Sequence, residues 1–398
     1  MAFNWLRSAA ETSPARQAAA PSEAKASAVG AAVAWATTGR AAWSPRDSVS
    51  LARNGFGRNV IGFRCVRMVA EAAAAVPMIL SDGVRRLDVH PAAHLLERPN
   101  PGQVRAAFLE SVYGHLLLSG DAFVEAAGVL ASGLPAELYA LRPDRMRVIP
   151  GADGWPEAYE YAVGAKKVRF DMSPEAQPIL HLKTFHPLDD HYGMSPMEAA
   201  MASVDIHNSA GGWSKALLDN AARPSGAIVY RAADGGTMTE SQYRRLVEEL
   251  EENHQGARNA GRPMLLEGGL DWKPMGFSPS DMEFLQTKTA AARDIAIAFG
   301  VPPMLLGIPG DATYANYQEA NRAFYRQTVL PLVSKVAAGF AAWLSAQAGE
   351  PIVLKPDLDA LPALAPEREA LWRRVSEADF LSEDEKRAML GLPPGGAR

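Results

Sequence analysis

The stretch GMSPMEAAMASVDIHNSAGGWSKALLDNAARPSG, residues 193–226, divides the chain into two parts with different sequence patterns. It opens with Ser-Pro-Met-Glu at 195–198, a capping box in which Ser and Glu side chains satisfy the first backbone N–H groups and Pro takes the first helical position. A long helix is therefore predicted over 195–222. Gly211-Gly212 lies inside it, and each interior glycine costs about 1 kcal/mol in a helix. We expect either a kink there or a shorter helix.

The residues before this stretch have a mixed pattern, mostly typical of β-strands. Two helices are predicted, at 59–76 and 104–118, where apolar residues recur at helical spacing. Elsewhere, short runs of alternating apolar and polar residues are separated by turn residues such as Asp153-Gly154, which is typical of strands joined by tight turns. The predicted strands lie at 123–126, 145–149, 159–163, 167–170 and 179–183.

The residues after this stretch are predicted to be mainly helical. A capping box at 280–283 precedes a helix over 281–299, which ends at Gly300 before Pro302-Pro303, a usual termination signal. A further helix is predicted over 316–346. Pro331 lies inside it and is expected to kink it, because the proline ring removes a hydrogen bond and crowds the preceding turn. Two more capping boxes lie at 239–242 and 382–385.

Between the predicted helices at 195–222 and 281–299 the sequence indicates a small α/β insert. Its helix carries charges of both signs, so i,i+4 ion pairs are predicted on the solvated face. The expected elements are a strand at 227–230, a helix at 240–253, and a strand pair around 263–274 that turns at Gly268-Gly269. The expected ion pairs are Arg244 with Glu248 and Arg245 with Glu249. Together with the mixed first half, the insert indicates an α+β fold.

The composition limits the class of protein. The chain has 398 residues, 48% of them hydrophobic, with a net charge of −5 and a pI near 6.0. Lys and Arg are scattered without a basic tract, which argues against tight or sequence-specific DNA binding, because such binding depends on neutralising phosphates. The single cysteine, Cys65, excludes an intrachain disulfide and a cysteine-only metal site. We expect synthesis in a reducing cytoplasm.

The N-terminal residues differ from the rest in composition. Residues 9–42 are rich in Ala, Ser, Thr and Pro, and so few large apolar residues cannot offset the entropy of ordering. A flexible arm is therefore predicted at 1–43, in which Trp5, Trp35 and Trp43 could anchor a partner. The sequence has no run of about 18 apolar residues, so no membrane-spanning helix is expected, and the start lacks the layout of a secretory signal.

Motifs that would indicate catalysis are missing from the sequence. There is no Gly-Lys dipeptide and hence no P-loop, and neither a Gly-x-Ser-x-Gly elbow nor a His-Glu-x-x-His motif is present. The best candidate is a cluster of His and Asp residues, but its five-residue steps place side chains on opposite faces of a strand, and Pro187 breaks the segment. We expect no enzyme activity, no metal and no cofactor. The cluster consists of His181, His186, Asp189, Asp190 and His191.

An ordered set of short motifs resembles the portal proteins of tailed double-stranded DNA phages of the siphovirus type. The most characteristic pair is GMSPM at 193–197 and NAARPSG at 220–226. LLLSGDAFVE at 116–125 departs from the family's usual Gly-Asn-Ala, because Asp121 stands in place of the asparagine. The other motifs are HPAAHLLERPNP (90–101), LYALRPDRMRV (138–148), ILHLKTF (179–185), FGVPPMLLG (299–307), TYANYQE (313–319), residues 328–332, and EKRAMLGLPP (385–394). The overall chain length, which is short for a phage portal, and the residues of the motifs are most similar to the portals of gene transfer agents.

The resemblance implies a portal-type α+β fold with a mixed α/β wing, a two-helix stem, a small α/β clip insert, a long kinked helix and a helical crown at the C-terminus. Its regions would be the flexible arm (1–43), the wing (44–192), the first stem helix (193–223), the clip (224–277), the second stem helix (278–299), the tunnel loop (300–315), the long helix with its connection (316–360), and the crown (361–398).

The resemblance also implies the function of a portal. Copies of the chain would form a ring, usually a dodecamer in the particle, at one capsid vertex, and DNA would pass through the ring during packaging and ejection. Implied partners are the terminase large subunit, a head–tail adaptor and the major capsid protein, without a membrane and without sequence-specific contact to DNA. Implied tunnel-loop residues that touch DNA are Met304, Leu305, Leu306, Gly307, Asp311, Thr313, Tyr314 and Asn316. Implied clip residues that bind partners are Arg244, Arg245, Glu248, Glu249, Gly268 and Gly269.

Two other functions stay open at this point. A metal-dependent enzyme would use the cluster at 181–191, and metal analysis of the purified protein separates it from a portal. A monomeric DNA-binding module would need a basic face and a salt-sensitive affinity, which the composition disfavours.

Overall fold

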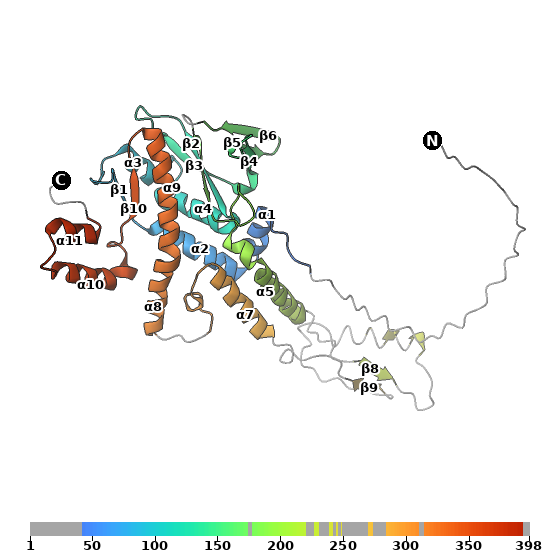
Figure 1. Cartoon of the computed structure of the whole chain (residues 1–398). Coiled ribbons are helices and arrows are strands. Elements are labelled where there is room, and N and C mark those ends of the chain that lie inside the picture. Colours follow the sequence, from blue (N-terminus) through green and yellow to red (C-terminus); the bar gives the residue numbers. More distant parts are fainter. Residues whose placement is uncertain are drawn as a thin grey trace, which may run out of the picture. The chain divides into compact units, whose positions relative to one another are not determined.

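The computed structural model describes residues 42–173, 177–219, 227–230, 239–241, 244–245, 248, 270–273, 284–309 and 314–392 (Figure 1). The predicted flexible arm lies outside these residues except for its last two, and so does most of the expected clip. The predicted capping boxes at 239–242 and 280–283 also fall wholly or partly outside them.

The core is built around three helices whose apolar faces meet: α2 (Val60–Ala75), α4 (Arg105–Ser119) and α9 (Leu330–Ala348). Phe108 of α4 meets Phe340 of α9 edge to face, with the ring centroids 6.2 Å apart, and the two side chains are 1% and 2% exposed. Because a buried aromatic side chain removes about 150–250 Å² from water, this contact fixes the two helices against each other. The helices predicted at 59–76 and 104–118 are confirmed.

Short elements complete the ends of these helices. α1 (Ser48–Ser50) and the π-helical segment η1 (Leu51–Gly57) precede α2, which Asn59 caps by accepting a hydrogen bond from the backbone N of Gly62 over 2.9 Å. α3 (Pro91–Glu97) begins with proline, and the ring Nδ1 of His90 accepts a hydrogen bond from the backbone N of Ala92. Both starts are set by local side chains, as expected for helix N-termini.

The core helices are accompanied by three antiparallel sheets, of which the third packs against the second in a smaller hydrophobic cluster that includes Phe123 and Tyr159. β1 (Met78–Ser81) pairs with β10 (Val353–Pro356), and a second sheet has the order β3 (Glu137–Leu141), β2 (Asp121–Ala127), β7 (Ile179–Lys183). The third has the order β4 (Met146–Pro150), β5 (Pro156–Val163), β6 (Lys166–Asp171), joined to β3 by the short 3-10 helix η2 (Pro143–Arg145). The five predicted strands are confirmed as β2, β4, β5, β6 and β7, whereas β1, β3 and β10 were not predicted.

The stretch at 193–226 begins the long helix α5 (Pro196–Asp219), which packs against α7 (Phe284–Ala298). The hydroxyl of Ser195 accepts a hydrogen bond from the backbone N of Glu198 over 2.9 Å, as the capping box predicts. α5 continues through Gly211 and Gly212, and a Cβ added at either would meet no atom within 4 Å. The glycines therefore do not end the helix, because the rest of α5 outweighs a cost of about 1 kcal/mol at each.

α8 (Tyr314–Phe324), the π-helical segment η4 (Tyr325–Val329) and α9 follow one another without a break (Figure 1). The interruption expected at Pro331 takes the form of η4, which ends two residues before the proline. Proline cannot donate a backbone hydrogen bond and crowds the carbonyl four residues earlier. A π-helical turn widens the hydrogen-bond pattern there and accommodates the ring within a continuous helix.

By length and composition, the helix over Asn316–Ala348 could cross a membrane, which the sequence analysis did not expect. Its large apolar side chains nevertheless pack into the core of the subunit: Val333, Val336 and Leu344 are at most 1% exposed. Its apolar character is thus explained by burial within this fold.

The described part of the insert contains two strands, β8 (Ala227–Tyr230) and β9 (Leu270–Lys273), which pair with each other in antiparallel register. The predicted strand pair at 263–274 stays a prediction, because residues 263–269, with its first strand and its turn, lie outside the described part; β9 pairs with a strand 40 residues earlier, which was not predicted. Pairing of distant strands depends on tertiary packing that a local turn signal does not record.

The C-terminal part contains η5 (Pro362–Leu364), α10 (Ala365–Ser376) and α11 (Glu383–Leu390). The predicted capping box at 382–385 is confirmed in full, because Ser382 and Glu385 each satisfy the other's backbone N–H. Asp359 holds α10 through two hydrogen bonds from the guanidinium of Arg368, at 2.5 and 2.9 Å.

Candidate channel segment and its junction with the wing

The implied tunnel loop begins where α7 ends. Gly300 adopts φ +64°, a left-handed conformation that favours glycine, and its carbonyl accepts a hydrogen bond of 2.6 Å from the hydroxyl of Thr328 in η4. A Cβ at this position would lie 2.5 Å from the same hydroxyl. The close approach ties the start of the segment to the long helix α8–α9.

The first half of the segment folds back onto the core. Residues Pro303–Leu306 form the 3-10 helix η3, which ends at Gly307 with φ +72°. Leu305 and Ile308 are each 9% exposed, so they anchor the segment within their own subunit. Leu305 was implied to touch DNA, but its burial assigns it to the core, whereas Met304 and Leu306 are half-buried and Gly307 is exposed.

The second half of the segment is described only in part. The guanidinium of Arg293 on α7 donates a hydrogen bond to the carbonyl of Pro309, the last residue before the gap. Asp311 and Thr313 lie outside the described residues. The chain resumes at Tyr314, two residues earlier than the predicted helix start, and Asn316 is exposed on α8.

Of the implied clip residues, Arg244, Arg245 and Glu248 lie at exposed helical positions, whereas Glu249, Gly268 and Gly269 lie outside the described residues. Arg244 forms an i,i+4 ion pair with Glu240 over 2.6 Å, not with Glu248 as predicted. Both side chains are more than 70% exposed, so the ion pair adds little stability.

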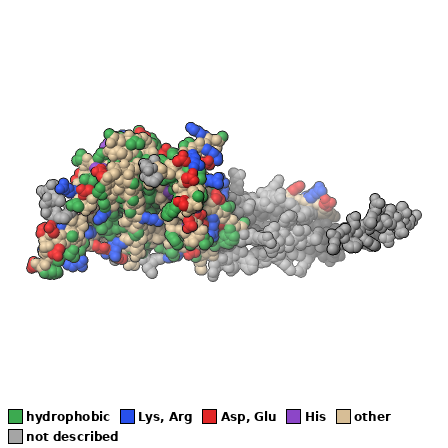
Figure 2. Space-filling model, turned by 45° about the horizontal axis from the view of Figure 1, so that its top comes forward, with side chains coloured by type: hydrophobic (Ala, Val, Ile, Leu, Met, Phe, Trp, Pro, Cys, Tyr) green, Lys and Arg blue, Asp and Glu red, His purple; other side chains and the backbone are tan. Residues whose placement is uncertain are grey.

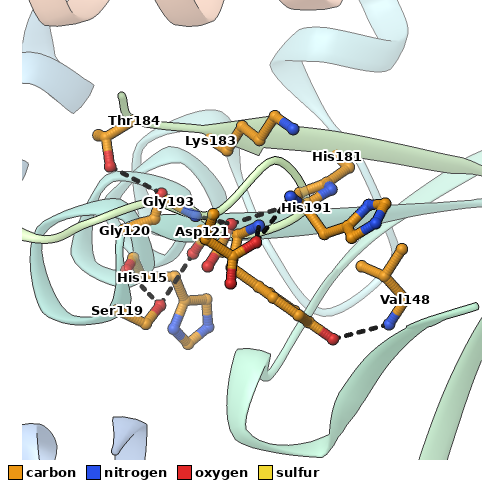
Figure 3. Close-up of polar contacts among 12 residues, drawn as sticks. His115, Ser119, Gly120, Asp121, Val148, His181, Lys183, Thr184, His191 and Gly193 are labelled. Carbon is orange, nitrogen blue, oxygen red and sulfur yellow. Dashed lines mark hydrogen bonds and ion pairs between the residues drawn. The ribbon is translucent and has the colours of Figure 1, made fainter. Parts of the chain in front are cut away.

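Asp121 is the centre of a buried polar network that joins strands β2 and β7 to the start of α5 (Figure 3). It is the first residue of β2 and is 4% exposed. Its Oδ1 accepts a hydrogen bond from Nε2 of His181 on β7 over 2.8 Å, and another from the backbone N of Gly193 over 2.9 Å. Because an ionised carboxylate only accepts hydrogen bonds, Nε2 of His181 carries the proton. The two hydrogen bonds offset the cost of burying the Asp121 carboxylate, and removing either donor leaves it only partly compensated.

The imidazole of His181 is held on its other sides by aromatic rings. Its ring stacks on Phe123 with the centroids 4.2 Å apart and the planes at 21°. The hydroxyl of Tyr159 lies 3.4 Å from Nδ1. His181 therefore has one orientation, in which it donates to Asp121.

Two glycines allow the backbones at this junction to touch. A Cβ on Gly193 would lie 2.1 Å from the carbonyl O of Gly120, which ends α4 with φ +82°. The backbone N of Thr184 also donates to the Gly120 carbonyl, over 2.9 Å. The turn after α4, the end of β7 and the residues before α5 are thus fixed to one another.

The sequence motifs at 116–125, 179–185 and 193–197 all meet at this network. Each was singled out separately, and none carries a local signal that it contacts the others. The departure at Asp121, where the resembled family usually has asparagine, is the one sequence feature that pointed to it.

The His and Asp cluster at 181–191 is divided among different contacts. His181 pairs with Asp121, Nδ1 of His186 accepts a hydrogen bond from the backbone N of Leu188, and Asp189 accepts one from the backbone N of His191. Within the described residues, no group of three or more His, Cys, Asp or Glu side chains is arranged to hold a metal ion. The structure therefore offers no geometry for a metal-dependent reaction at this cluster.

A second polar network joins α2 to the middle of α5. Asn59 is 1% exposed, and its amide nitrogen lies 3.2 Å from Nδ1 of His207 and donates to Oδ1 of Asn208 over 3.0 Å. Since the amide nitrogen can only donate, Nδ1 of His207 must be unprotonated. Burial lowers the pKa of His207, and the positive charge of Lys288 lowers it further, so the imidazole stays neutral.

The surface shows charges of both signs. On the face in Figure 2, acidic and basic side chains are interspersed among hydrophobic ones, without a continuous basic area. This face does not have the charge that a tight DNA-binding surface needs.

Known proteins resemble this chain over most of its length. The phage portal protein family model matches residues 61–391. The probable portal protein of Streptomyces phage phiC31 is 30% identical over 353 residues, which cover 84% of this chain and 75% of that protein.

Solved structures of gene transfer agent particles contain similar chains. In the neck of an empty particle with C6 symmetry, the matching chain is 64% identical with a TM-score of 0.72, and the match covers 89% of this chain and 96% of that one. In the neck of the native particle with C12 symmetry, the matching chain is 62% identical with a TM-score of 0.69 and the same coverage.

Proposed function

Because this chain belongs to the phage portal protein family, we propose that it is a subunit of the portal ring in a particle of the gene transfer agent type. Its function is that of a portal: copies form a ring around a channel at one capsid vertex, and DNA passes through the channel during packaging and ejection. The likeness to the neck chains, at 62% identity or above, carries the assignment to a gene transfer agent. The symmetry of the native neck supports twelve copies.

The stem helices support assembly into a ring. α5 and α7 pack against each other, and α7 buries Ala292, Ile295 and Ala296 in its own subunit. α7 also leaves Leu285 79% and Ile297 69% exposed. Large apolar side chains exposed on an ordered helix are expected to contact a neighbouring copy.

We assign the channel constriction to the residues between Pro309 and Asn316. The support is the ends of the segment: η3 and Gly300 hold one end against the core, and the other end enters α8. Asp311 would form a ring of carboxylates there, which repels phosphates over about 8–10 Å at physiological salt and favours sliding over adhesion.

We assign the remaining partners by region. The insert at 224–277 would dock the terminase large subunit and later a head–tail adaptor, and the arm at 1–43 would contact the major capsid protein. The exposed helix with Arg244, Arg245 and Glu248 supports the first assignment, because it offers charged side chains that the subunit's core does not use. The family is not an enzyme class, and nothing in the proposed role requires catalysis.

Negative-stain imaging and native mass spectrometry of the full-length protein test the proposal. We expect rings with a central hole and a mass that is a multiple of 42.6 kDa, twelve in the particle. A 42.6 kDa monomer at every concentration, and also inside assembled particles, would contradict it.

A further inference from the structure

A small pocket opens among strands β1 and β10 and helices α3, α4 and α9. It has a volume of about 90 Å³. Figure 1 shows the β1–β10 pair beside α9. The lining is mostly apolar, and the large side chains Leu80 of β1, Phe340 of α9 and Leu354 of β10 are each at most 8% exposed. The interior of the pocket is therefore shielded from water on most sides.

The mouth of the pocket is polar. Nη1 of Arg105 on α4 lies 3.4 Å from a carboxylate oxygen of Glu97 on α3. The side chain of Glu97 is 66% exposed and that of Arg105 is 24% exposed, so the carboxylate stands in solvent and the guanidinium lies closer to the interior. Because arginine has several N–H donors, one ion pair of this length leaves most of them available to a ligand.

The hydroxyl of Tyr113 is directed into the same pocket. Tyr113 follows Arg105 and Leu109 on α4 at four-residue steps, so the three side chains share one face of the helix. A side chain on a helix leans toward the N-terminus of that helix, which directs the ring of Tyr113 toward Leu109 and Arg105. Burial raises the pKa of Tyr113, and the positive charge of Arg105 lowers it. The hydroxyl and the guanidinium therefore face each other across the pocket, and the hydroxyl stays protonated.

The Tyr113 hydroxyl has no partner in its own subunit. Tyr113 is only 2% exposed, and its hydroxyl makes no hydrogen bond to any described residue. No fully buried side-chain oxygen in the described part of the chain lacks a partner, so this hydroxyl is not sealed in the core but opens into the pocket. A desolvated hydroxyl without a partner is unfavourable, and a ligand that bonds to it gains more than one that only fills apolar space.

The apolar walls suit an aromatic ring. A closed apolar cavity of about 150 Å³ holds benzene, so a pocket of about 90 Å³ that is open at one end has room for one ring with its edge at the mouth. The rings of Phe340 and Tyr113 can pack against an aromatic ligand. The thioether of Met78, which also lines the pocket, makes favourable contacts with ring edges.

We propose that this pocket binds a small neutral phenol, an aromatic ring that carries one hydroxyl. The ring would lie among Leu80, Leu109 and Phe340, and its hydroxyl would bond to that of Tyr113. A hydroxyl also suits the mouth, because it can accept from Arg105 and donate to the carboxylate of Glu97. A carboxylate in its place would face Glu97 with the same charge. The site lies within one subunit and requires no ring, so it goes beyond the proposed function.

Ligand-detected NMR on the full-length protein tests the site with phenol, toluene and benzoate as probes. Phenol should bind with a Kd of about 1 mM, as expected for so small a ligand. Toluene, in which a methyl group replaces the hydroxyl, and benzoate should each bind about fivefold more weakly or less. No binding of phenol up to about 20 mM would overturn the proposal, because water would then be the partner of Tyr113. Toluene or benzoate binding as tightly as phenol would overturn it as well.

Tyr113→Phe removes the hydroxyl alone. The affinity for phenol should fall about fivefold or more, and the affinity for toluene should not change. The variant should melt like the wild type, because the hydroxyl has no partner in the subunit. The matched control is Tyr159→Phe, whose hydroxyl lies 3.4 Å from Nδ1 of His181 and outside the pocket, and which should bind phenol like the wild type. Equal affinity of phenol for Tyr113→Phe and wild type would contradict the assignment.

Filling the pocket gives a second measurement. Ala93 of α3 is a half-buried lining residue, and Ala93→Leu should prevent phenol from binding. Ala106→Leu adds the same bulk at an exposed position of α4 outside the lining and should leave binding unchanged. Circular dichroism checks that both variants fold, and Tyr113→Phe decides alone if Ala93→Leu does not. Phenol that binds folded Ala93→Leu with wild-type affinity occupies another place, and the proposal is then wrong.

Discussion

Helix α5 is attached to the rest of the subunit at two points whose chemistry differs. At its start, the carboxylate of Asp121 accepts hydrogen bonds from His181 and from the backbone of Gly193. At its middle, the neutral amide of Asn59 bonds to His207 and Asn208. Both central residues are almost fully buried, at 4% and 1% exposure.

The difference concerns what remains when one partner is removed. A buried charge that loses its partner leaves an uncompensated group, which costs more than the intact pair contributes. A neutral amide that is removed leaves only unsatisfied neutral partners, at about 1–3 kcal/mol. The start of α5 is therefore expected to be more sensitive to substitution than its middle.

The largest effect is expected at Asp121. Asp121→Ala leaves two buried donors, Nε2–H of His181 and the N–H of Gly193, without an acceptor, at about 1–3 kcal/mol each, and should lower the free energy of unfolding by roughly 3 kcal/mol or more. Asp121→Asn keeps an acceptor oxygen and should recover at least half of that loss. Urea titration followed by circular dichroism measures both.

The matched control is Asp88→Ala, which breaks an exposed ion pair with Arg86 and should cost less than about 1 kcal/mol. If Asp121→Ala is no worse than Asp88→Ala, the junction does not hold α5.

A smaller loss is expected at Asn59. Asn59→Ala removes the cap of α2, which is worth about 1 kcal/mol, and two further side-chain contacts. The free energy of unfolding should fall by about 2 kcal/mol. Asn59→Asp keeps the cap but places a charge between His207 and Asn208. This variant therefore tests directly whether the contact with α5 must be neutral. An Asn59→Ala variant that loses as much stability as Asp121→Ala would contradict the comparison.

Low pH should weaken the contact between Asn59 and His207. The pKa of His207 lies below its ordinary value of 6.5 because the ring is buried. The unfolded chain then binds the proton more readily than the folded one, so the contribution of this network is fully present above pH 6.5 and is lost as pH falls through the lower, folded pKa. His207→Gln, whose oxygen can accept from Asn59, should flatten this part of the stability profile between pH 7 and pH 5. Equal slopes for wild type and variant in thermal melts would contradict the assignment.

The smallest effect is expected where α5 makes neither kind of contact. Gly211→Ala and Gly212→Ala place a methyl group in open space and should each raise the free energy of unfolding of the subunit by about 0.5–1 kcal/mol. Gly193→Ala is the opposite control, because its Cβ would clash with the carbonyl of Gly120. Destabilisation by Ala at 211 or 212 would show that the glycines are needed for a contact within the subunit.

Much of the fold could be predicted from local signals. Caps and terminators act within a few residues, so the sequence predicted them. Examples are the start of α5 at Ser195, the end of α7 before Gly300, and the capping box at Ser382. The strands β1 and β10 were missed since each has four residues, too few for a clear alternation, and they pair across more than 270 residues of sequence. The burial of Leu305 was missed for a similar reason: a Pro- and Gly-rich run is typical of a loop, and nothing local shows that the loop folds onto the core.

The sequence by itself determined the class of fold, the order of its helices and strands, and, through an ordered set of motifs, the resemblance to portal proteins. Only the tertiary structure decided which motifs meet. Asp121 lies 60 residues from His181 and 72 from Gly193, and these residues come together because β2 pairs with β7 and Gly120 contacts Gly193. The physical reason is the sequence distance over which each interaction acts. Hydrogen bonds within a turn join residues that are close in the sequence, so the sequence predicts them. The burial that makes Asp121 depend on its partners arises only when distant segments pack together and exclude water.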